Sequence, residues 1–344
     1  MKTVLITGTS KGIGLETSLA FGRAGYKVFA TMRNTDMASD FKEKIKNESL
    51  DITIYEMNVD SDASVKKCID AIISKHGKVD VLVNNAGIER HGYVEELSME
   101  DFKSVMETNY FGVLRCTKSL LPIMRKNQNG CIINVASVSG HISSSPLGAY
   151  AASKFALEAV SEALAQEVKP FNIRVAIVEP GIINTQMAQN IKGVTASKSI
   201  YPQVNRFGGL FAASLKTPTP PTLVAEKILE ISESNTWKLR HPVGPDSEPF
   251  IQWRASMSDE QWIDWNAASD EDIAQCKLVY ADILLMQNEI WDAILYYSQV
   301  DKAYKHDVLG HEAKFRRAKI SYYQGDFDWA QAQLDVLKKS TAKL

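Results

Sequence analysis

The sequence predicts an α/β protein with a doubly wound parallel sheet, followed by a small all-helical tail. Apolar, β-branched-rich runs alternate with helix-period segments in the first part, which is typical of a parallel sheet covered on both faces. The composition then shifts: all 11 prolines lie at or before Pro249, and residues 276–344 contain only two of the 19 glycines. Within that tail, a pattern of 37 residues repeats.

Each predicted strand is a short continuous apolar run, as expected for a strand buried on both faces. The predicted strands are 3–7, 27–31, 51–55, 79–83, 130–135 and 172–178. The helix-period segments between them are roughly 12–24, 36–47, 62–76, 100–127 and 148–169. A further helix at about 222–233 and a short run at 237–241 would extend the sheet.

Length and composition bound the class of protein. A chain of 344 residues makes one large domain or two ordinary ones, and we place an α/β domain at 1–275 and a helical tail at 276–344. A net charge of −2 without a Lys/Arg block argues against a nucleic-acid partner. No run reaches the roughly 18 apolar residues of a transmembrane helix, and no signal-peptide stretch is visible at the N-terminus.

The cysteines indicate a reducing compartment. They are scattered, without a CxxC pair or a nearby His at ligand spacing, so we expect reduced thiols rather than a disulfide framework or a zinc site. They are Cys68, Cys116, Cys131 and Cys276. We therefore expect a cytoplasmic protein with no bound metal.

The tail repeats a helix–turn–helix unit. Residues 281–300 align with 318–337, and each copy has an apolar helix, a short polar turn (QNE or QGD) and a second apolar helix. The second copy, with YYQGDFDWA, resembles a tetratricopeptide repeat, whereas Asn288 replaces the turn glycine in the first. Because roughly three repeats usually suffice for stability, we expect this tail to pack on the first domain, a second subunit or a partner protein. It could also be a natural or constructed fusion.

A glycine-rich segment follows the first strand and opens the first helix. Glycines let the backbone turn tightly and approach a pyrophosphate, which then lies at the helix N-terminus. An ordinary turn between a strand and a helix needs fewer glycines. The expected cofactor-binding residues are Gly8, Ser10, Lys11, Gly12, Ile13 and Gly14.

Two further motifs lie at strand ends. Asn84, Asn85, Ala86 and Gly87 follow the fourth strand, where small residues leave room for a flat ligand, although alone they could form a turn. Ser137 ends the fifth strand.

Tyr150 and Lys154 are four residues apart, so they share one helix face. A phenol is a poor acid–base near neutral pH unless a neighbouring cation favours its anion. Ser137 can hydrogen-bond a carbonyl or alkoxide oxygen. A surface Tyr and Lys on an amphipathic helix is the alternative for this spacing alone.

In chain order, the motifs resemble the short-chain dehydrogenase/reductase family. The set comprises TGTSKGIG, NNAG, Asn109, Ser137, Tyr150 with Lys154, and Pro180-Gly181. The resemblance covers about residues 1–250 and is nearest in character to the hydroxysteroid/retinol branch. It implies a Rossmann-type domain in which one domain holds both cofactor and substrate.

The resemblance also implies residue roles. Tyr150 would donate or accept the proton, Lys154 would lower its pKa and bind the nicotinamide ribose, and Ser137 would polarise the substrate oxygen. Asn109 would hold a proton-relay water. The expected cofactor contacts, beyond the glycine-rich segment, are Arg33, Asp60, Asn84, Ala86, Gly87, Tyr150, Lys154, Pro180, Gly181 and Thr185.

The end of the second strand favours NADP (NADPH) over NAD. NAD-dependent enzymes place an acid there to accept the ribose hydroxyls, but this chain has Thr31 and Met32. Arg33 and Lys11 are instead available to a 2′-phosphate, which arginine binds through a bidentate fork. Asp36 is the competing candidate for an NAD-type acid, although it falls in the next helix.

The long segment at 182–216 predicts a lid or binding loop. Its apolar residues favour an apolar carbonyl or alcohol substrate, such as a steroid, a retinoid, or a fatty or aromatic ketone or aldehyde; packing into the core is the alternative. They are Ile182, Ile183, Met187, Ile191, Ile200, Tyr201, Phe207, Leu210 and Phe211.

The helix at 148–169 is apolar around most of its circumference, which predicts burial on a second side and a homodimer or homotetramer. Cover by the chain's own tail is the alternative. The leading function is an NADP-dependent oxidoreductase. A nucleotide-sensing scaffold, whose tail recruits a partner, is the second hypothesis, but Ser137, Tyr150 and Lys154 are all retained, which favours the enzyme.

Overall fold

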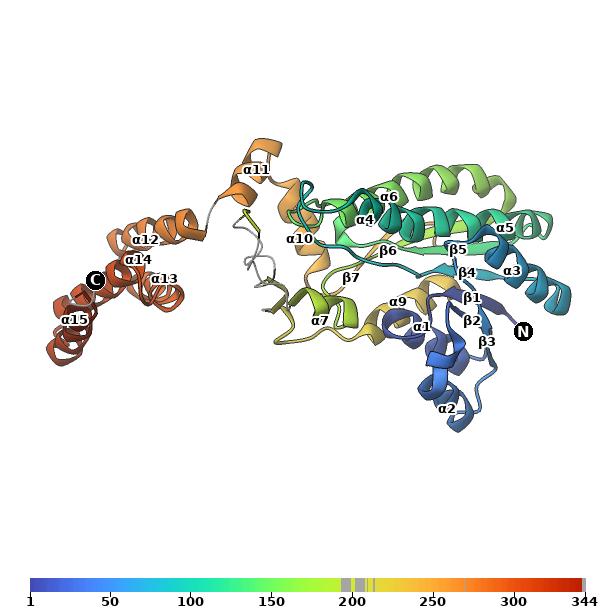
Figure 1. Cartoon of the computed structure of the whole chain (residues 1–344), viewed down its shortest axis with the longest axis horizontal. Coiled ribbons are helices and arrows are strands. Elements are labelled where there is room, and N and C mark those ends of the chain that lie inside the picture. The colour runs from blue at the N-terminus through green and yellow to red at the C-terminus, as the bar shows by residue number, and fades with distance from the viewer. Residues whose placement is uncertain (193–198, 202–207, 209, 213, 269, 342–344) are drawn as a thin grey trace. The chain divides into compact units, whose positions relative to one another are not determined.

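The computed structural model describes residues 1–192, 199–201, 208, 210–212, 214–268 and 270–341 (Figure 1). The chain forms two compact units, Met1–Trp262 and Ile263–Leu344. Each unit is described by itself below. Among the described residues, none of the helices has both the length and the apolarity needed to cross a membrane.

The first unit is built on a parallel sheet of seven strands in the order β3-β2-β1-β4-β5-β6-β7. The strands are β1 (Thr3–Thr7), β2 (Lys27–Met32), β3 (Ile52–Glu56), β4 (Val81–Asn84), β5 (Gly130–Val135), β6 (Ile173–Pro180) and β7 (Arg240–Val243). All six predicted strands are therefore confirmed, and the apolar run at 237–241 overlaps the seventh.

Alternate side chains of each strand enter two separate cores, one on each face of the sheet. On β1, Val4 and Ile6 enter one core while Leu5 enters the other. This follows from the two-residue period of a strand, and it explains why the predicted strands are continuously apolar.

Helices cover both faces, as expected for a doubly wound sheet (Figure 1). One face carries α1 (Gly12–Arg23), α2 (Ser39–Asn47) and α9 (Pro221–Glu233). The other carries α3 (Asp62–His76), α5 (Gly112–Lys126) and α6 (Gly148–Val168). Further helices in the described part of this unit are α4 (Met99–Met106), α7 (Gln186–Lys192), α10 (Ser247–Ala255) and the first part of α11 (Asp259–Ala267).

The predicted helix at 100–127 is interrupted. A π-helical segment, Glu107–Phe111, separates α4 from α5 and contains Asn109. Such single turns insert an extra residue into a helix and are frequent at functional sites. Periodicity alone cannot reveal them because the apolar pattern continues on both sides.

The second unit consists of consecutive helices joined by short turns: α12 (Asp270–Met286), α13 (Ile290–Ala303), α14 (Val308–Tyr323) and α15 (Phe327–Thr341). Each helix contacts the next along the chain. The boundary we expected after residue 275 falls inside α12, whereas the contacts divide the chain after Trp262. Trp262 contacts the rest of the first unit: its indole N–H donates a hydrogen bond to the Ser143 carbonyl at 2.9 Å, and its ring packs against that of Trp253.

The two turns of the predicted repeat are built alike. Asn288 and Gly325 both adopt the left-handed conformation, with φ of 65° and 84°. In the first turn, the backbone N–H of Glu289 donates to the carbonyl of Leu284. In the second, the N–H of Asp326 donates to the carbonyl of Ser321. The same hydrogen bond therefore closes both turns, 37 residues apart. Asparagine tolerates this conformation better than other non-glycine residues, which explains its presence in the first turn.

Candidate active site

A cavity of about 530 Å³ opens at the carboxyl ends of the strands. Its walls come mainly from the ends of β1 to β6 and the segments that follow these strands. In a doubly wound sheet, ligands bind where the strand order reverses, which here lies between β1 and β4. The size falls in the range of sites for small molecules and cofactors.

The glycine-rich turn forms one end of the cavity, and its glycines are required sterically. Gly8 and Gly12 have positive φ values of 71° and 59°. A Cβ on Gly14 would lie 2.3 Å from the Gly8 carbonyl oxygen, which leaves no room for a side chain. The predicted residues Ser10, Lys11 and Ile13 also line this end.

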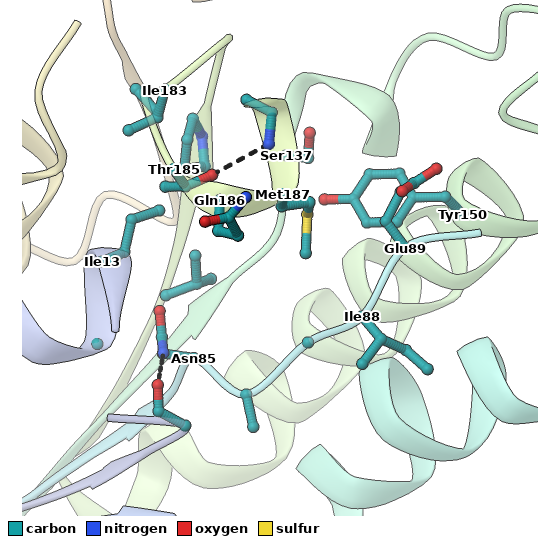
Figure 2. A pocket seen from close by; sticks show the side chains of 18 of the residues that line it. Ile13, Asn85, Ile88, Glu89, Ser137, Tyr150, Ile183, Thr185, Gln186 and Met187 are labelled. Carbon is teal, nitrogen blue, oxygen red and sulfur yellow. Dashed lines mark hydrogen bonds between the residues drawn. The ribbon is translucent and has the colours of Figure 1, made fainter. Parts of the chain in front are cut away.

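The turn after β4 is fastened to the glycine-rich turn. The Thr7 hydroxyl accepts hydrogen bonds from the backbone N–H groups of Asn85 and Ala86, at 3.0 and 2.9 Å. The Asn85 amide donates to the carbonyls of Thr7 and Gly8, at 2.9 and 3.0 Å (Figure 2). Sequence reasoning placed Asn85 in a motif but gave it no role, because this bond depends on the pairing of β1 with β4.

Asn84 lies behind the cavity rather than on its wall. It is buried and donates to the Asn134 side chain at 2.8 Å and to the Thr117 hydroxyl at 3.3 Å. Ala86 and Gly87, which we also expected to contact the cofactor, line the cavity. The structure therefore places Asn84 as a support for the β4 end.

Tyr150 on α6 and Ser137 after β5 face the middle of the cavity. Burial raises the pKa of Tyr150 to about 12, the nearby Ser137 hydrogen bond lowers it, and the Glu89 charge raises it. The phenol is therefore protonated at neutral pH in this state. It is placed to donate a proton.

Lys154 lies one helical turn from Tyr150 and is only 5% exposed. Its Nζ is 5.6 Å from the Tyr150 ring centroid and donates a 2.9 Å hydrogen bond to the Val135 carbonyl. Burial lowers the pKa of Lys154 to about 8, against the charge of Glu158, which raises it. The expectation that Lys154 lowers the pKa of Tyr150 stays a prediction.

Asn109 holds the backbone near the substrate end in place. Its Oδ1 accepts from the Ile88 N–H at 2.8 Å, and its Nδ2 donates to the Ile88 carbonyl at 2.9 Å and to the Ser153 hydroxyl at 3.0 Å. It is buried and does not line the cavity. The proton-relay water implied by the resemblance stays a prediction.

At the nucleotide end, Lys11 and Arg33 are exposed and line the cavity, whereas Asp36 does not. Asp60 also lines it, and its Oδ1 is buried without a hydrogen-bond partner among the described residues. An unpartnered buried acceptor is costly unless a ligand donates to it. The Asp60 oxygen could accept from the amino group of a base. Together with the glycine-rich turn, it therefore fits a dinucleotide whose base carries an amino group.

The segment after β6 closes the cavity from the other side. Pro180, Gly181 and Thr185, which we expect to contact the cofactor, line it. A Cβ on Gly181 would lie 2.1 Å from a carboxylate oxygen of Asp246, and the other oxygen of that carboxylate accepts from the Ile182 N–H at 2.8 Å. Glycine therefore lets Asp246 brace this loop.

The predicted lid segment is described only in part. Ile182, Ile183, Met187, Ile191 and Phe211 line the cavity, which agrees with an apolar substrate end. Phe207 lies outside the described residues.

Glu89, immediately before Arg90 on the loop after β4, is the residue that sequence reasoning missed (Figure 2). In the sequence, Glu89 stands out only as an acidic residue that follows the motif Asn84–Gly87 by two positions.

A sheet of this topology, with a glycine-rich turn at its switch point and a Tyr–Lys–Ser set in the same cavity, defines a dinucleotide-binding oxidoreductase. Residues 2–194 match the model of the short chain dehydrogenase family. The chain belongs to the short-chain dehydrogenase/reductase family.

Among curated relatives, the chain is 40% identical over 187 residues to a 3-ketodihydrosphingosine reductase of Bacteroides thetaiotaomicron, a match that covers 54% of this chain and 66% of the relative. It is 41% identical over 190 residues to bovine (Bos taurus) retinol dehydrogenase 8, which covers 54% of this chain and 60% of the relative. The chain thus spans about two thirds or less of these two relatives.

Among solved structures, the chain is similar to a single-residue variant of actinorhodin polyketide ketoreductase with NADPH. The TM-score is 0.65 at 28% identity, and the match covers 71% of this chain and 96% of that one.

Proposed function

We propose that this oxidoreductase uses NADP and transfers a hydride between the nicotinamide and an apolar carbonyl or alcohol. The observation that carries the proposal is one cavity whose lining includes Tyr150, Ser137 and Lys154 together with the glycine-rich turn. The relatives named as a retinol dehydrogenase and a 3-ketodihydrosphingosine reductase support a steroid, retinoid, fatty or aromatic substrate.

The nicotinamide supplies or takes up the hydride when bound. For reduction, Tyr150 holds a proton at its phenol oxygen and donates it to the carbonyl oxygen of the substrate; in oxidation it accepts that proton. Ser137 donates a hydrogen bond to the same oxygen and orients it. Lys154, buried beside the phenol, provides the positive charge that would stabilise the phenolate and would bind the ribose hydroxyls.

The preference for NADP is carried by the charges at the end of β2. Lys11 and Arg33 both line the cavity with exposed side chains, where they would bind a 2′-phosphate. Asp36 is outside the lining, and its N–H is engaged with the Asn34 side chain at 2.8 Å. This arrangement of charges supports NADP over NAD.

We also retain the proposal of a homodimer or homotetramer through α6. Phe155 is 44% exposed in the single chain, and Ala152, Ala159 and Ala163 are exposed at helical spacing beside it. A smooth stripe of small residues around an aromatic side chain would pack against a second copy. The helical tail would offer a separate surface to a protein partner, and a cytoplasmic location accords with four free cysteines.

The test is a screen of the purified full-length chain. NADPH and NADH consumption would be followed with steroid, retinoid, fatty and aromatic ketones and aldehydes. We expect turnover of at least one apolar class, with kcat/KM higher for NADPH. A chain that binds NADPH tightly yet reduces no member of these classes would contradict the proposed function and favour the nucleotide-sensing scaffold.

A further inference from the structure

Glu89 places a carboxylate inside the cavity at its substrate end. The side chain is 8% exposed and lines the same cavity as Tyr150 and Ser137. Figure 2 shows it beside the Tyr150 ring, and its charge raises the pKa of the Tyr150 phenol. Because Glu89 and Tyr150 line the same cavity, a substrate whose oxygen contacts Tyr150 would lie in the space that the Glu89 carboxylate also faces.

One oxygen of this carboxylate has a protein partner. Oε1 lies 3.0 Å from Nδ1 of His91, and this hydrogen bond raises the pKa of the imidazole. For Oε2, no hydrogen bond appears among the described residues, whereas burial of a carboxylate oxygen favours a donor. His91 therefore orients the carboxylate and leaves the second oxygen for another group.

The cavity that holds Glu89 has several large apolar side chains, and Arg90 lines it as well. The apolar residues include Ile88, Leu147, Met187, Ile191 and Phe211. A negative charge among apolar walls attracts a cation far more strongly than a charge in water does. The same charge repels an anion, and it adds no binding energy for a neutral apolar group.

We propose that Glu89 selects substrates that carry an ammonium group on the carbon next to the reacting carbonyl or alcohol, with an apolar tail beyond it. This inference rests on the proposed oxidoreductase function and names its substrate class. The ammonium donates to Oε2 of Glu89 while the substrate oxygen accepts from Tyr150 and Ser137. The apolar tail lies along Met187, Ile191 and Phe211.

The reaction balances without a further reactant. In oxidation, the carbinol carbon gives its hydride to NADP⁺ and the hydroxyl gives its proton to the Tyr150 phenolate, so a vicinal amino alcohol becomes an α-amino ketone. The ammonium keeps its protons throughout. Because it compensates the Glu89 charge, it removes one of the influences that oppose the phenolate.

The test compares alcohols that differ in one group. Full-length chain and NADP⁺ would be assayed with the vicinal amino alcohol of a dodecane chain, the matching vicinal diol, and the plain secondary dodecanol. The wild type should have the highest kcat/KM for the amino alcohol. In Glu89→Gln, the ratio of kcat/KM for amino alcohol over diol should fall by about tenfold to hundredfold, as expected for a lost charged hydrogen bond.

Two variants separate this effect from misfolding. Glu89→Asp keeps the charge and should retain a higher ratio than Glu89→Gln. Glu100→Gln removes an exposed carboxylate that does not line the cavity, and its ratio should equal that of the wild type. NADPH binding, measured by fluorescence, would show that each variant has an intact cofactor site.

The outcomes are distinguishable. If the wild type oxidises the diol and the plain alcohol as well as the amino alcohol, and Glu89→Gln leaves the ratio unchanged, the selection by Glu89 is wrong while the oxidoreductase function stands. If no alcohol or ketone of any class is turned over by a chain that binds NADPH, the proposed function itself fails.

Discussion

The two units of this chain bring residues together in opposite ways. In Met1–Trp262, residues far apart in sequence meet: Thr7 bonds to Asn85, and Lys154 bonds to the Val135 carbonyl. In Ile263–Leu344, contacts run mainly from each helix to the next. A parallel sheet gathers its strand ends at one edge, whereas a helical repeat propagates one local arrangement.

The difference extends to where the chemistry-bearing groups lie. In the first unit, Lys154 is 5% exposed and lines the cavity beside Tyr150, and burial lowers its pKa to about 8. In the described part of the second unit, the buried Lys314 forms an ion pair with Asp301, and Trp291 is 80% exposed. A buried lysine with a lowered pKa in a cavity is typical of an active site, so we expect catalysis to depend on the first unit.

The largest effect should come from Tyr150→Phe. The ring stays in place while the proton-donating oxygen is lost, so turnover should fall by about 10²–10⁴-fold with NADPH affinity nearly unchanged. Steady-state reduction kinetics and NADPH fluorescence titration would measure both. Activity close to that of the wild type would remove Tyr150 from its role.

Arg33→Asp should reverse the cofactor preference. The new carboxylate would repel a 2′-phosphate and could accept ribose hydroxyls, so the NADPH/NADH ratio of kcat/KM should fall by roughly tenfold to hundredfold. Asp36→Asn, outside the cavity lining, serves as the matched control and should leave the ratio unchanged. A wild type that prefers NADH would contradict the argument from Lys11 and Arg33.

Ser137→Ala should shift a pH profile. The Ser137 hydrogen bond lowers the pKa of Tyr150, so its loss raises that pKa. Oxidation requires the phenolate, and the rising limb of its kcat/KM against pH should therefore move to higher pH. If the rising limb of the kcat/KM profile stays at the same pH or moves to lower pH, Ser137 does not lower the pKa of the Tyr150 phenol.

In the second unit, the two turn residues should respond in opposite directions. Gly325→Ala forces a side chain into the left-handed conformation at φ 84°, and we expect a loss of about 1 kcal/mol in unfolding free energy. Asn288→Gly should be neutral or slightly stabilising, because glycine adopts φ 65° without a steric cost. Chemical denaturation followed by circular dichroism would compare them. Equal destabilisation by both would contradict the equivalence of the two turns.

The sequence predicted the sheet because its strands bury both faces and therefore read as continuous apolar runs. It also brought Ser137, Tyr150 and Lys154 into one site, since their order and spacing are specific to a family. It did not predict the role of Glu89, whose position beside Tyr150 depends on how the loop after β4 folds back.

The composition change that suggested a boundary at 275 and the contacts that divide the chain after Trp262 mark different positions. The composition change marks where prolines stop, but Trp262 bonds to Ser143 across a long sequence separation. The π-helical segment at Asn109 likewise leaves no mark on the apolar period. Contacts between residues far apart in the sequence, and a residue inserted into a helix, are not recorded in local patterns.

The smallest effect should come from removing the second unit's helices. A chain that ends at Ala268, just before α12, retains the cavity and Trp262. Its kcat/KM for NADPH-dependent reduction should equal that of the full-length chain, whatever happens to its sedimentation or solubility. This comparison most directly tests the claim that catalysis belongs to the first unit. A truncated chain that is folded by circular dichroism but inactive would contradict it.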